Sequence, residues 1–199
     1  ANGLKPADLV KQHKEIDRLN KKLKGFSIYK GVECDILPNG DLDFSDDILR
    51  TFDFVIGAVH SKFNMTEPEM TARVIKAMSN KYFSILAHPT GRLLLSREPY
   101  PINLEEVIKA AAKYKKVIEL NCNPHRFDLD WRWCKIAKEH GVKIALCPDA
   151  HQKEGIADIY YGVGIARKGW LEKSDVINCL TPPLPSPNGG GKKGGVGEA

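Results

Sequence analysis

Five side chains that can donate a lone pair to a metal ion lie in or just after apolar runs of the sequence. Glu33 lies in GVECDI, His60 ends FDFVIGAVH and His88 ends SILAH, while Asp149 and His151 follow ALCP. Carboxylates and imidazoles are the ligands that divalent transition metals take in proteins. We therefore predict one metal site whose five ligands come from four separate strand ends: Glu33, His60, His88, Asp149 and His151.

Metal sites of this composition hydrolyse phosphate esters. A bound divalent ion lowers the pKa of a water molecule and neutralises charge on the phosphoryl oxygens. Glu33, Asp149 and His151 are the predicted catalytic residues. A phosphate substrate also needs cationic side chains, and we predict this role for residues that follow strand ends: Lys62, Arg92 and Arg126. For each of these, and for Arg167 in VGIARKGW, a solvated surface position is an equally good interpretation.

Other polar residues near the predicted strand ends have weaker assignments. Asp35 lies two residues after Glu33, on the same face of its strand, and is expected to orient a ligand. Asn121 ends the fourth strand and stays unassigned. Cys147 has no nearby base in the sequence, so covalent cysteine catalysis is not favoured. The other three histidines are not predicted to bind metal: His13 and His140 fall within helices, and His125 lies at the expected pocket rim.

The elements that must position these residues alternate between helix and strand. Five runs predict strands, at residues 27–36, 52–60, 82–89, 116–123 and 142–151, and the second of them is nearly all apolar, as in a strand that is buried on both faces. Parallel βα units follow from this alternation, and right-handed crossovers place every strand C-terminus on one side of the sheet. An open doubly wound sheet and a barrel both fit, and both bind ligands beyond the strand C-termini. No G-x-G-x-x-G or Walker A loop indicates a nucleotide.

The predicted helices have recognisable ends. Apolar residues at helical spacing predict a first helix over residues 7–24. Thr66 and Glu69 form a capping box, and Asn103 can cap a helix that begins at residue 104. Either Asp128 or Asp130 can cap a helix that carries Trp133, Ile136 and Ala137 and ends at Gly141.

Bulk composition narrows the class of protein. A chain of 199 residues with 42% hydrophobic and 28% charged residues is typical of one globular domain. No apolar run reaches the ~20 residues that span a bilayer, and the first residues do not resemble a secretory signal, so a cytoplasmic protein is expected. The five cysteines form no C-x-x-C pair, which argues against disulfides and structural zinc. The net charge of +5 suits a phosphate substrate, but charge alone favours a solvated basic surface.

The C-terminal residues differ in composition from the rest. PPLPSPNGGGKKGGVGEA, residues 182–199, is rich in proline and glycine and lacks apolar residues for a core. We predict one domain over residues 1–181 and a flexible tail over residues 182–199.

Several strings in one order resemble the PHP (polymerase and histidinol phosphatase) domain, and most closely its form at the C-terminus of bacterial and archaeal family X DNA polymerases. They are GVECDILPNGDLDF, VIGAVHSKFNM, ILAHPTGRLL, IELNCNPHRFDL, CPDAH and YGVGIARKGWLEKSDVIN. The resemblance implies a distorted (β/α)7 TIM-like barrel with two to three zinc or manganese ions. It implies a phosphoesterase or 3′–5′ exonuclease acting on DNA ends in DNA repair, with a polymerase domain as partner. Glu33 matches the bridging carboxylate, and His60, His88, Asp149 and His151 match later ligands.

The sequence departs from that family at its start. The family begins with an H-x-H strand and a further histidine motif, and neither is present. We therefore expect a barrel that lacks about two βα units at its N-terminus and holds fewer metal ions. Such a barrel has an open edge, which favours self-association.

Three other functions stay open. A phosphatase of small phosphate esters, like histidinol-phosphate phosphatase, would use the same fold and ligands. A non-catalytic module that supports a polymerase or contacts DNA would explain the missing motifs. A metal-dependent amidohydrolase is less favoured because no predicted strand ends in the lysine that such enzymes use.

Overall fold

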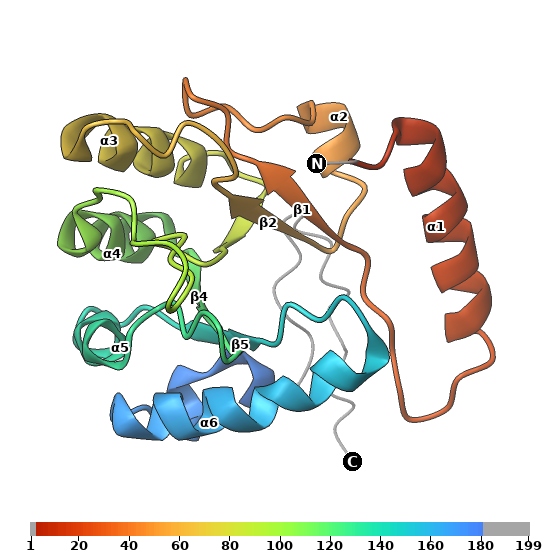
Figure 1. The fold of residues 1–199 in the computed structure, drawn as a ribbon. Coiled ribbons are helices and arrows are strands. Elements are labelled where there is room, and N and C mark those ends of the chain that lie inside the picture. The colour runs from red at the N-terminus through yellow and green to blue at the C-terminus, as the bar shows by residue number, and fades with distance from the viewer. Residues whose placement is uncertain (1–2, 181–199) are drawn as a thin grey trace, which may run out of the picture.

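Five parallel strands form a single sheet in a computed structural model of the chain, which describes residues 3–180 (Figure 1). The strands are β1 (Gly31–Asp35), β2 (Phe54–Ala58), β3 (Phe83–Leu86), β4 (Val117–Asn121) and β5 (Ile144–Cys147). Each pairs in parallel with the next along the chain. All five predicted strands are confirmed, and each observed strand is shorter than its predicted range.

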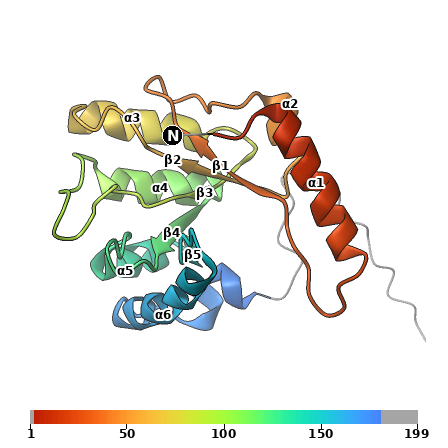
Figure 2. The same cartoon turned by 45° about the vertical axis from the view of Figure 1, so that its right-hand side comes forward.

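The helices lie beside the sheet, and its strand order distinguishes the two predicted architectures. The helices are α1 (Pro6–Asn20), α2 (Asp46–Leu49), α3 (Glu67–Met78), α4 (Leu104–Tyr114), α5 (Trp131–Glu139) and α6 (Ile159–Lys168), with 3-10 turns η1 (Lys153–Asp158), η2 (Lys173–Asp175) and η3 (Ile177–Cys179). Figures 1 and 2 show α3, α4 and α5 side by side on one face of the sheet. A doubly wound sheet reverses its strand order, and this sheet does not. The fold is therefore α/β, with the strand order of a barrel wall.

Capping interactions place the helix starts as predicted. The Thr66 N–H donates to Glu69 Oε2 at 2.9 Å, and the Glu106 N–H donates to Asn103 Oδ1 at 3.1 Å. Asp130 caps α5 by accepting from the Arg132 N–H at 3.0 Å, so Asp128 does not have that role. The first helix ends at Asn20 rather than at residue 24.

Two apolar clusters hold the sheet to its helices. The larger lies between the sheet and α3, α4 and α5 and includes Val74, Ile108 and Ile118, all fully buried. The smaller joins Leu9, the one buried residue of α1, to Val55 and other residues near β1 and β2. The side chains that face these clusters alternate along each strand, so the intervening residues point to the opposite face of the sheet.

Helix α6 was not predicted from the sequence. It contains Gly162 and Gly164, and glycine lowers helix propensity. A side chain at residue 162 would overlap Cys122 Sγ, so glycine permits the close approach of α6 to β4 there. The low helix propensity of glycine can be read from the sequence, but the contact with Cys122 that requires glycine cannot, so α6 was missed.

β1 and β5 do not pair with each other within residues 3–180, so each is a sheet edge there. Asn178 partly covers the β5 edge, because its side-chain amide accepts from the Leu146 N–H at 2.8 Å and donates to the Leu146 carbonyl at 3.0 Å. None of the helices in this part of the chain has the length and apolar content needed to cross a membrane. The predicted tail, residues 182–199, lies outside the described residues.

Candidate metal centre

Glu33 on β1 lies between two histidines from the neighbouring strands. Its Oε1 atom is 3.1 Å from His60 Nε2 and 3.5 Å from His88 Nε2. His60 follows β2 and His88 follows β3, so the sequential parallel order brings the three strand ends to one place. One ligand atom from each of the three residues lies within 4.8 Å of the others. The structure thus brings together three of the five predicted metal ligands.

The spacing of these atoms fits a transition-metal ion. Ligand bonds of ~2.0–2.1 Å in a tetrahedral centre place neighbouring ligand atoms ~3.3 Å apart. The two Glu33–histidine separations, 3.1 Å and 3.5 Å, lie on either side of that value. One carboxylate and two imidazoles also form a ligand set that leaves a coordination position open, as in catalytic zinc sites.

Asp35 orients His60 from the same strand as Glu33. Its Oδ1 atom is 2.6 Å from His60 Nδ1, so the nitrogen that faces away from Glu33 is held by a second carboxylate. This is the contact expected from the two-residue spacing of Glu33 and Asp35. A carboxylate on the far nitrogen fixes the imidazole ring and makes it a better ligand.

Hydrogen bonds within the cluster shift the pKa values of Glu33 and His60 strongly. Hydrogen bonding to His60 and then to His88 holds the pKa of Glu33 well below its usual range, so this carboxylate is ionised at neutral pH. The hydrogen bond with Glu33 is the largest cause that raises the pKa of His60, to about 8. In the metal-free protein His60 is therefore mostly the imidazolium, protonated on both ring nitrogens, at neutral pH. A metal ion that binds Nε2 must displace one of these protons.

Asp149 and His151 lie on the loop after β5, at the sheet edge opposite β1, and are not part of this cluster. Asp149 Oδ2 accepts from Asn121 Nδ2 at 3.0 Å and lies 3.5 Å from Arg126 Nε. The His151 side chain is 88% exposed, and its Nδ1 lies 2.8 Å from the Asp149 carbonyl oxygen. Asn121, unassigned from the sequence, positions Asp149 in this arrangement.

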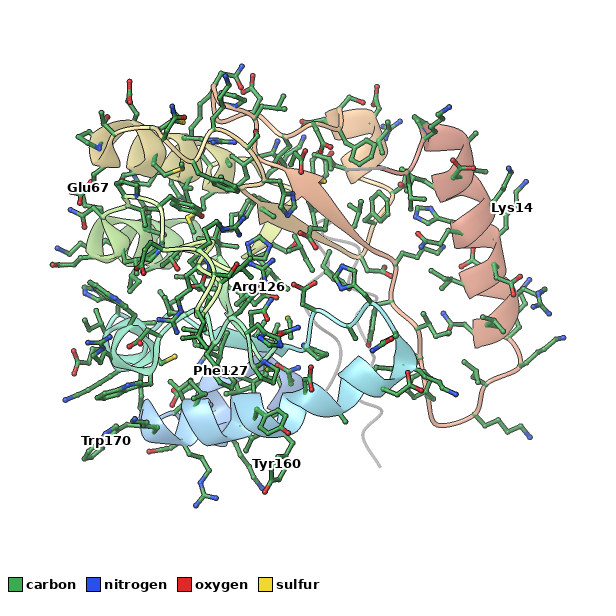
Figure 3. All side chains as sticks on the ribbon, viewed as in Figure 1. Lys14, Glu67, Arg126, Phe127, Tyr160 and Trp170 are labelled. Atoms are coloured by element: carbon green, nitrogen blue, oxygen red, sulfur yellow. The ribbon has the colours of Figure 1, made fainter. Side chains whose placement is uncertain are left out.

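The predicted phosphate-binding residues differ in their surroundings. Lys62 is exposed and its ammonium group has no partner among residues 3–180. Arg126 lies toward the middle of the molecule in Figure 3. One of its terminal nitrogens is buried and has no hydrogen-bond partner among residues 3–180. Arg92 donates to the backbone carbonyls of Arg126 and Phe127, so it holds the loop that carries Arg126. Arg167 is exposed on α6.

Sequence reasoning missed Glu119, which lies beneath the cluster. Its side chain is buried, and its Oε2 atom accepts from the backbone N–H of His88. Burial raises the pKa of Glu119 to about 7. One signal was available, because Glu119 is a carboxylate inside the apolar run VIELN, two residues before Asn121 and on the same face of the strand.

Asp128 was also missed, since its sequence position suggested a helix cap. It is fully buried, and its Oδ2 atom accepts from the Thr90 N–H at 2.9 Å. Burial raises the pKa of Asp128. Burial likewise raises the pKa of the Cys147 thiol well above its usual value, which agrees with the prediction that this cysteine is not a nucleophile.

Comparison with known proteins identifies the family. No family model matches the chain. The chain is 46% identical over 179 residues to the DNA polymerase/3′-5′ exonuclease PolX of Bacillus subtilis (strain 168), which covers 90% of this chain but only 31% of that protein. It is 31% identical over 170 residues to a probable phosphatase of Thermoanaerobacter sp. (strain X514), covering 80% of this chain and 67% of that protein. The chain belongs to the PHP family.

A solved structure shares the fold of this PHP domain. The histidinol phosphate phosphatase of Lactococcus lactis, solved with zinc, L-histidinol and phosphate, superposes with a TM-score of 0.59 at 19% sequence identity. The match covers 82% of this chain and 75% of that chain. This likeness supports the α/β fold class and the TIM-like barrel expected from the sequence.

Proposed function

We propose that this PHP domain is a metal-dependent phosphoesterase, part of a family X DNA polymerase, that hydrolyses phosphoester bonds at DNA 3′ ends. The observation that carries the proposal is the position of Glu33 at hydrogen-bonding distance from both His60 and His88. The substrate class comes from the PolX relative, whose printed name includes 3′-5′ exonuclease. Because the chain spans 31% of that relative, the polymerase domain and DNA belong to the proposal.

Each residue has a defined part in the proposed reaction. Glu33, His60 and His88 would hold a divalent ion, which lowers the pKa of a bound water and neutralises phosphoryl charge. Arg126 and Lys62 bring positive charge to the rim where the substrate phosphate would lie. We include Asp149 and His151 as further ligands and catalytic residues, reached through movement of the loop after β5. Arg92 would contribute to substrate binding indirectly, because its hydrogen bonds to the loop position Arg126.

A second candidate keeps the chemistry and changes the substrate to a small phosphate ester. It is favoured by the probable-phosphatase relatives, of which the chain spans up to 67%. The exposed position of the cluster suits a DNA end better, since the Glu33 and His60 side chains are 40% and 37% exposed.

The test compares two substrates and two variants of the full chain. A 3′-labelled DNA strand and p-nitrophenyl phosphate are each incubated with protein that has been treated with chelator and then reloaded with zinc or manganese. We expect hydrolysis of the DNA and a loss of about 100-fold or more in Glu33→Gln, which removes a metal ligand. Glu67→Gln, at an exposed position at the start of α3 and on the outer side of the molecule in Figure 3, should keep full activity. Equal activity of Glu33→Gln and wild type on both substrates would overturn the proposal.

The proposal also covers the identity of the metal ion, the cellular role of the protein and its self-association. Zinc and manganese both suit the ligand set, and element analysis of purified protein separates them. We further propose a cytoplasmic role in DNA repair, and self-association through the sheet edges.

A further inference from the structure

Two tryptophans lie where the end of α6 meets α5, and each has a lysine beside its ring. Lys168 Nζ is 4.9 Å from the centroid of the Trp131 ring, and Lys135 Nζ is 5.7 Å from the centroid of the Trp170 ring. Gly169 permits this approach, because a side chain at residue 169 would overlap the carbonyl oxygen of Trp131. The two helices therefore share one surface, which we refer to as the aromatic-basic surface. Its residues are Trp131, Arg132, Lys135, Lys168 and Trp170.

The Trp170 ring is presented to solvent on a fixed backbone. Trp170 is 71% exposed, and its φ of 63° lies in the left-handed region, which is unfavourable for a residue with a side chain. Its carbonyl accepts from Lys138 Nζ at 3.0 Å, and its N–H donates to the Arg167 carbonyl at 3.1 Å. A large aromatic side chain that is held in place but left exposed is typical of an interface.

The lysines of the aromatic-basic surface are available to an anion. Lys135 and Lys168 are both exposed, and neither forms an ion pair with any other of residues 3–180. The neighbouring carboxylate of Asp130 is already occupied, since Arg132 Nε donates to its Oδ1 atom at 2.8 Å. Unpaired lysines attract phosphates, and an exposed aromatic ring stacks on bases. The combination fits a nucleic acid strand better than an acidic or an apolar partner alone.

Contacts between charged side chains connect this surface to the rim of the metal centre. Arg92 Nε donates to the Arg126 carbonyl at 2.9 Å, and Arg92 Nη1 lies 3.4 Å from Asp130 Oδ2. Asp130 in turn accepts from Arg132, so three arginines lead from the rim onto the aromatic-basic surface. Figure 3 shows Arg126 toward the middle of the molecule and Trp170 at its outer edge.

We propose that the aromatic-basic surface binds single-stranded DNA on the 5′ side of the 3′ end that the metal centre hydrolyses. Trp170 stacks on a base, and Lys135 and Lys168 contact phosphates. The inference rests on the proposed function in taking DNA as the nucleic acid. Paired bases are covered by their neighbours in the duplex, so the exposed ring favours an unpaired strand, and stacking of this kind tolerates any base.

The experiment measures the anisotropy of fluorescein-labelled oligo(dT) of about 20 nucleotides with the full chain, in chelator so that no DNA is hydrolysed. Trp170→Ala should weaken binding about 5-fold or more, because it removes a base–aromatic contact. Trp170→Phe retains a ring and should keep most of the affinity. A blunt-ended duplex should bind Trp170→Ala and wild type nearly equally.

A matched pair of charge reversals tests the phosphate contacts. Lys168→Glu and Lys14→Glu change the net charge equally, but Lys14 lies on α1 at the opposite edge of the molecule from Trp170 in Figure 3. Lys168→Glu should weaken oligo(dT) binding about 5-fold or more near 0.1 M salt. It should also reduce the slope of log affinity against log salt concentration by about 0.7, as expected when one phosphate contact with a single strand is lost. Lys14→Glu should change both quantities little.

Several results would refute the inference. They are wild-type protein that does not bind oligo(dT), wild-type affinity of both Trp170→Ala and Lys168→Glu, and equal losses in Lys168→Glu and Lys14→Glu. A Trp170→Ala protein that loses as much affinity for duplex as for oligo(dT) also contradicts stacking on unpaired bases. Failure of the proposed function is a separate outcome: if metal-loaded protein hydrolyses no DNA, the predicted losses of oligo(dT) affinity still support this binding surface.

Discussion

Replacement of Glu119 by glutamine should stabilise the metal-free protein at high pH and leave its stability at low pH nearly unchanged. Glu119 is buried beneath His88, and burial raises its pKa from 4.5 to about 7. A carboxyl group whose pKa is higher in the folded than in the unfolded state binds more protons when folded, between the two values. The free energy of unfolding therefore falls as the pH rises from 4.5 to about 7.

The size of this effect follows from the two pKa values. They differ by about 2.5, and each pKa unit corresponds to ~1.4 kcal/mol, so ionisation of Glu119 costs about 3 kcal/mol above pH 7. Glutamine is neutral at every pH and can still accept from the His88 N–H through its side-chain oxygen. Glu119→Gln should therefore be more stable than wild type by about 3 kcal/mol at pH 8 and by less than about 1 kcal/mol near pH 4.5.

Urea denaturation of chelator-treated protein at the two pH values measures this difference. The free energies are compared at equal m-values, so that a change in the denatured state is detected. Glu154→Gln, at an exposed position in η1, is the matched control and should change stability little at either pH. A Glu119→Gln protein that is destabilised equally at both pH values would refute the reasoning, because Glu119 would then not be a buried acid that ionises at a cost.

Three further predictions follow from other contacts. Zinc affinity should rise about tenfold per pH unit up to about pH 8 and then level off, because the ion displaces a proton from His60. Calorimetry in buffers of different ionisation enthalpy measures the released proton, and a zinc affinity that is constant between pH 6 and 8 would contradict this prediction. Gly162→Ala should lose ~1–3 kcal/mol through overlap with Cys122, whereas Gly164→Ala on the same helix, with open space around it, should gain up to ~1 kcal/mol; urea denaturation of both separates packing from helix propensity. Asn178→Ala should lose ~1–2 kcal/mol and increase self-association, because it leaves the Leu146 N–H and carbonyl on the β5 edge unpaired; sedimentation velocity tests this, and an unchanged monomer fraction counts against it.

The sheet and part of the site were predictable from local sequence patterns. Most of the strands are rich in apolar residues, and Thr66 and Asn103 are capping residues whose hydrogen bonds depend only on neighbours three positions away. Parallel pairing then places the ends of successive strands together, which is why the five candidate ligands were predicted to share one end of the sheet, and the structure groups Glu33, His60 and His88 there.

The remaining parts depend on contacts between distant residues. Asp128 lies 38 residues after Thr90 in the chain, and only the folded loop shows that it is buried against the turn that carries His88. Helix α6 contains glycines whose purpose appears only where it approaches Cys122. Asp149 lies at the far edge of the sheet from Glu33, and its hydrogen bond with Asn121 and its contact with Arg126 are set by loop conformation. Strand-end position alone therefore could not predict which of the five residues form one cluster.

The central claim is that Glu33, His60 and His88 hold one divalent ion. Crystals of the zinc-loaded protein, measured on both sides of the zinc absorption edge, test it directly through an anomalous difference map. We predict a peak at ~2.0–2.2 Å from Glu33 Oε1, His60 Nε2 and His88 Nε2 together. A map without a peak there, with Glu33 still hydrogen-bonded to His60, would contradict the account.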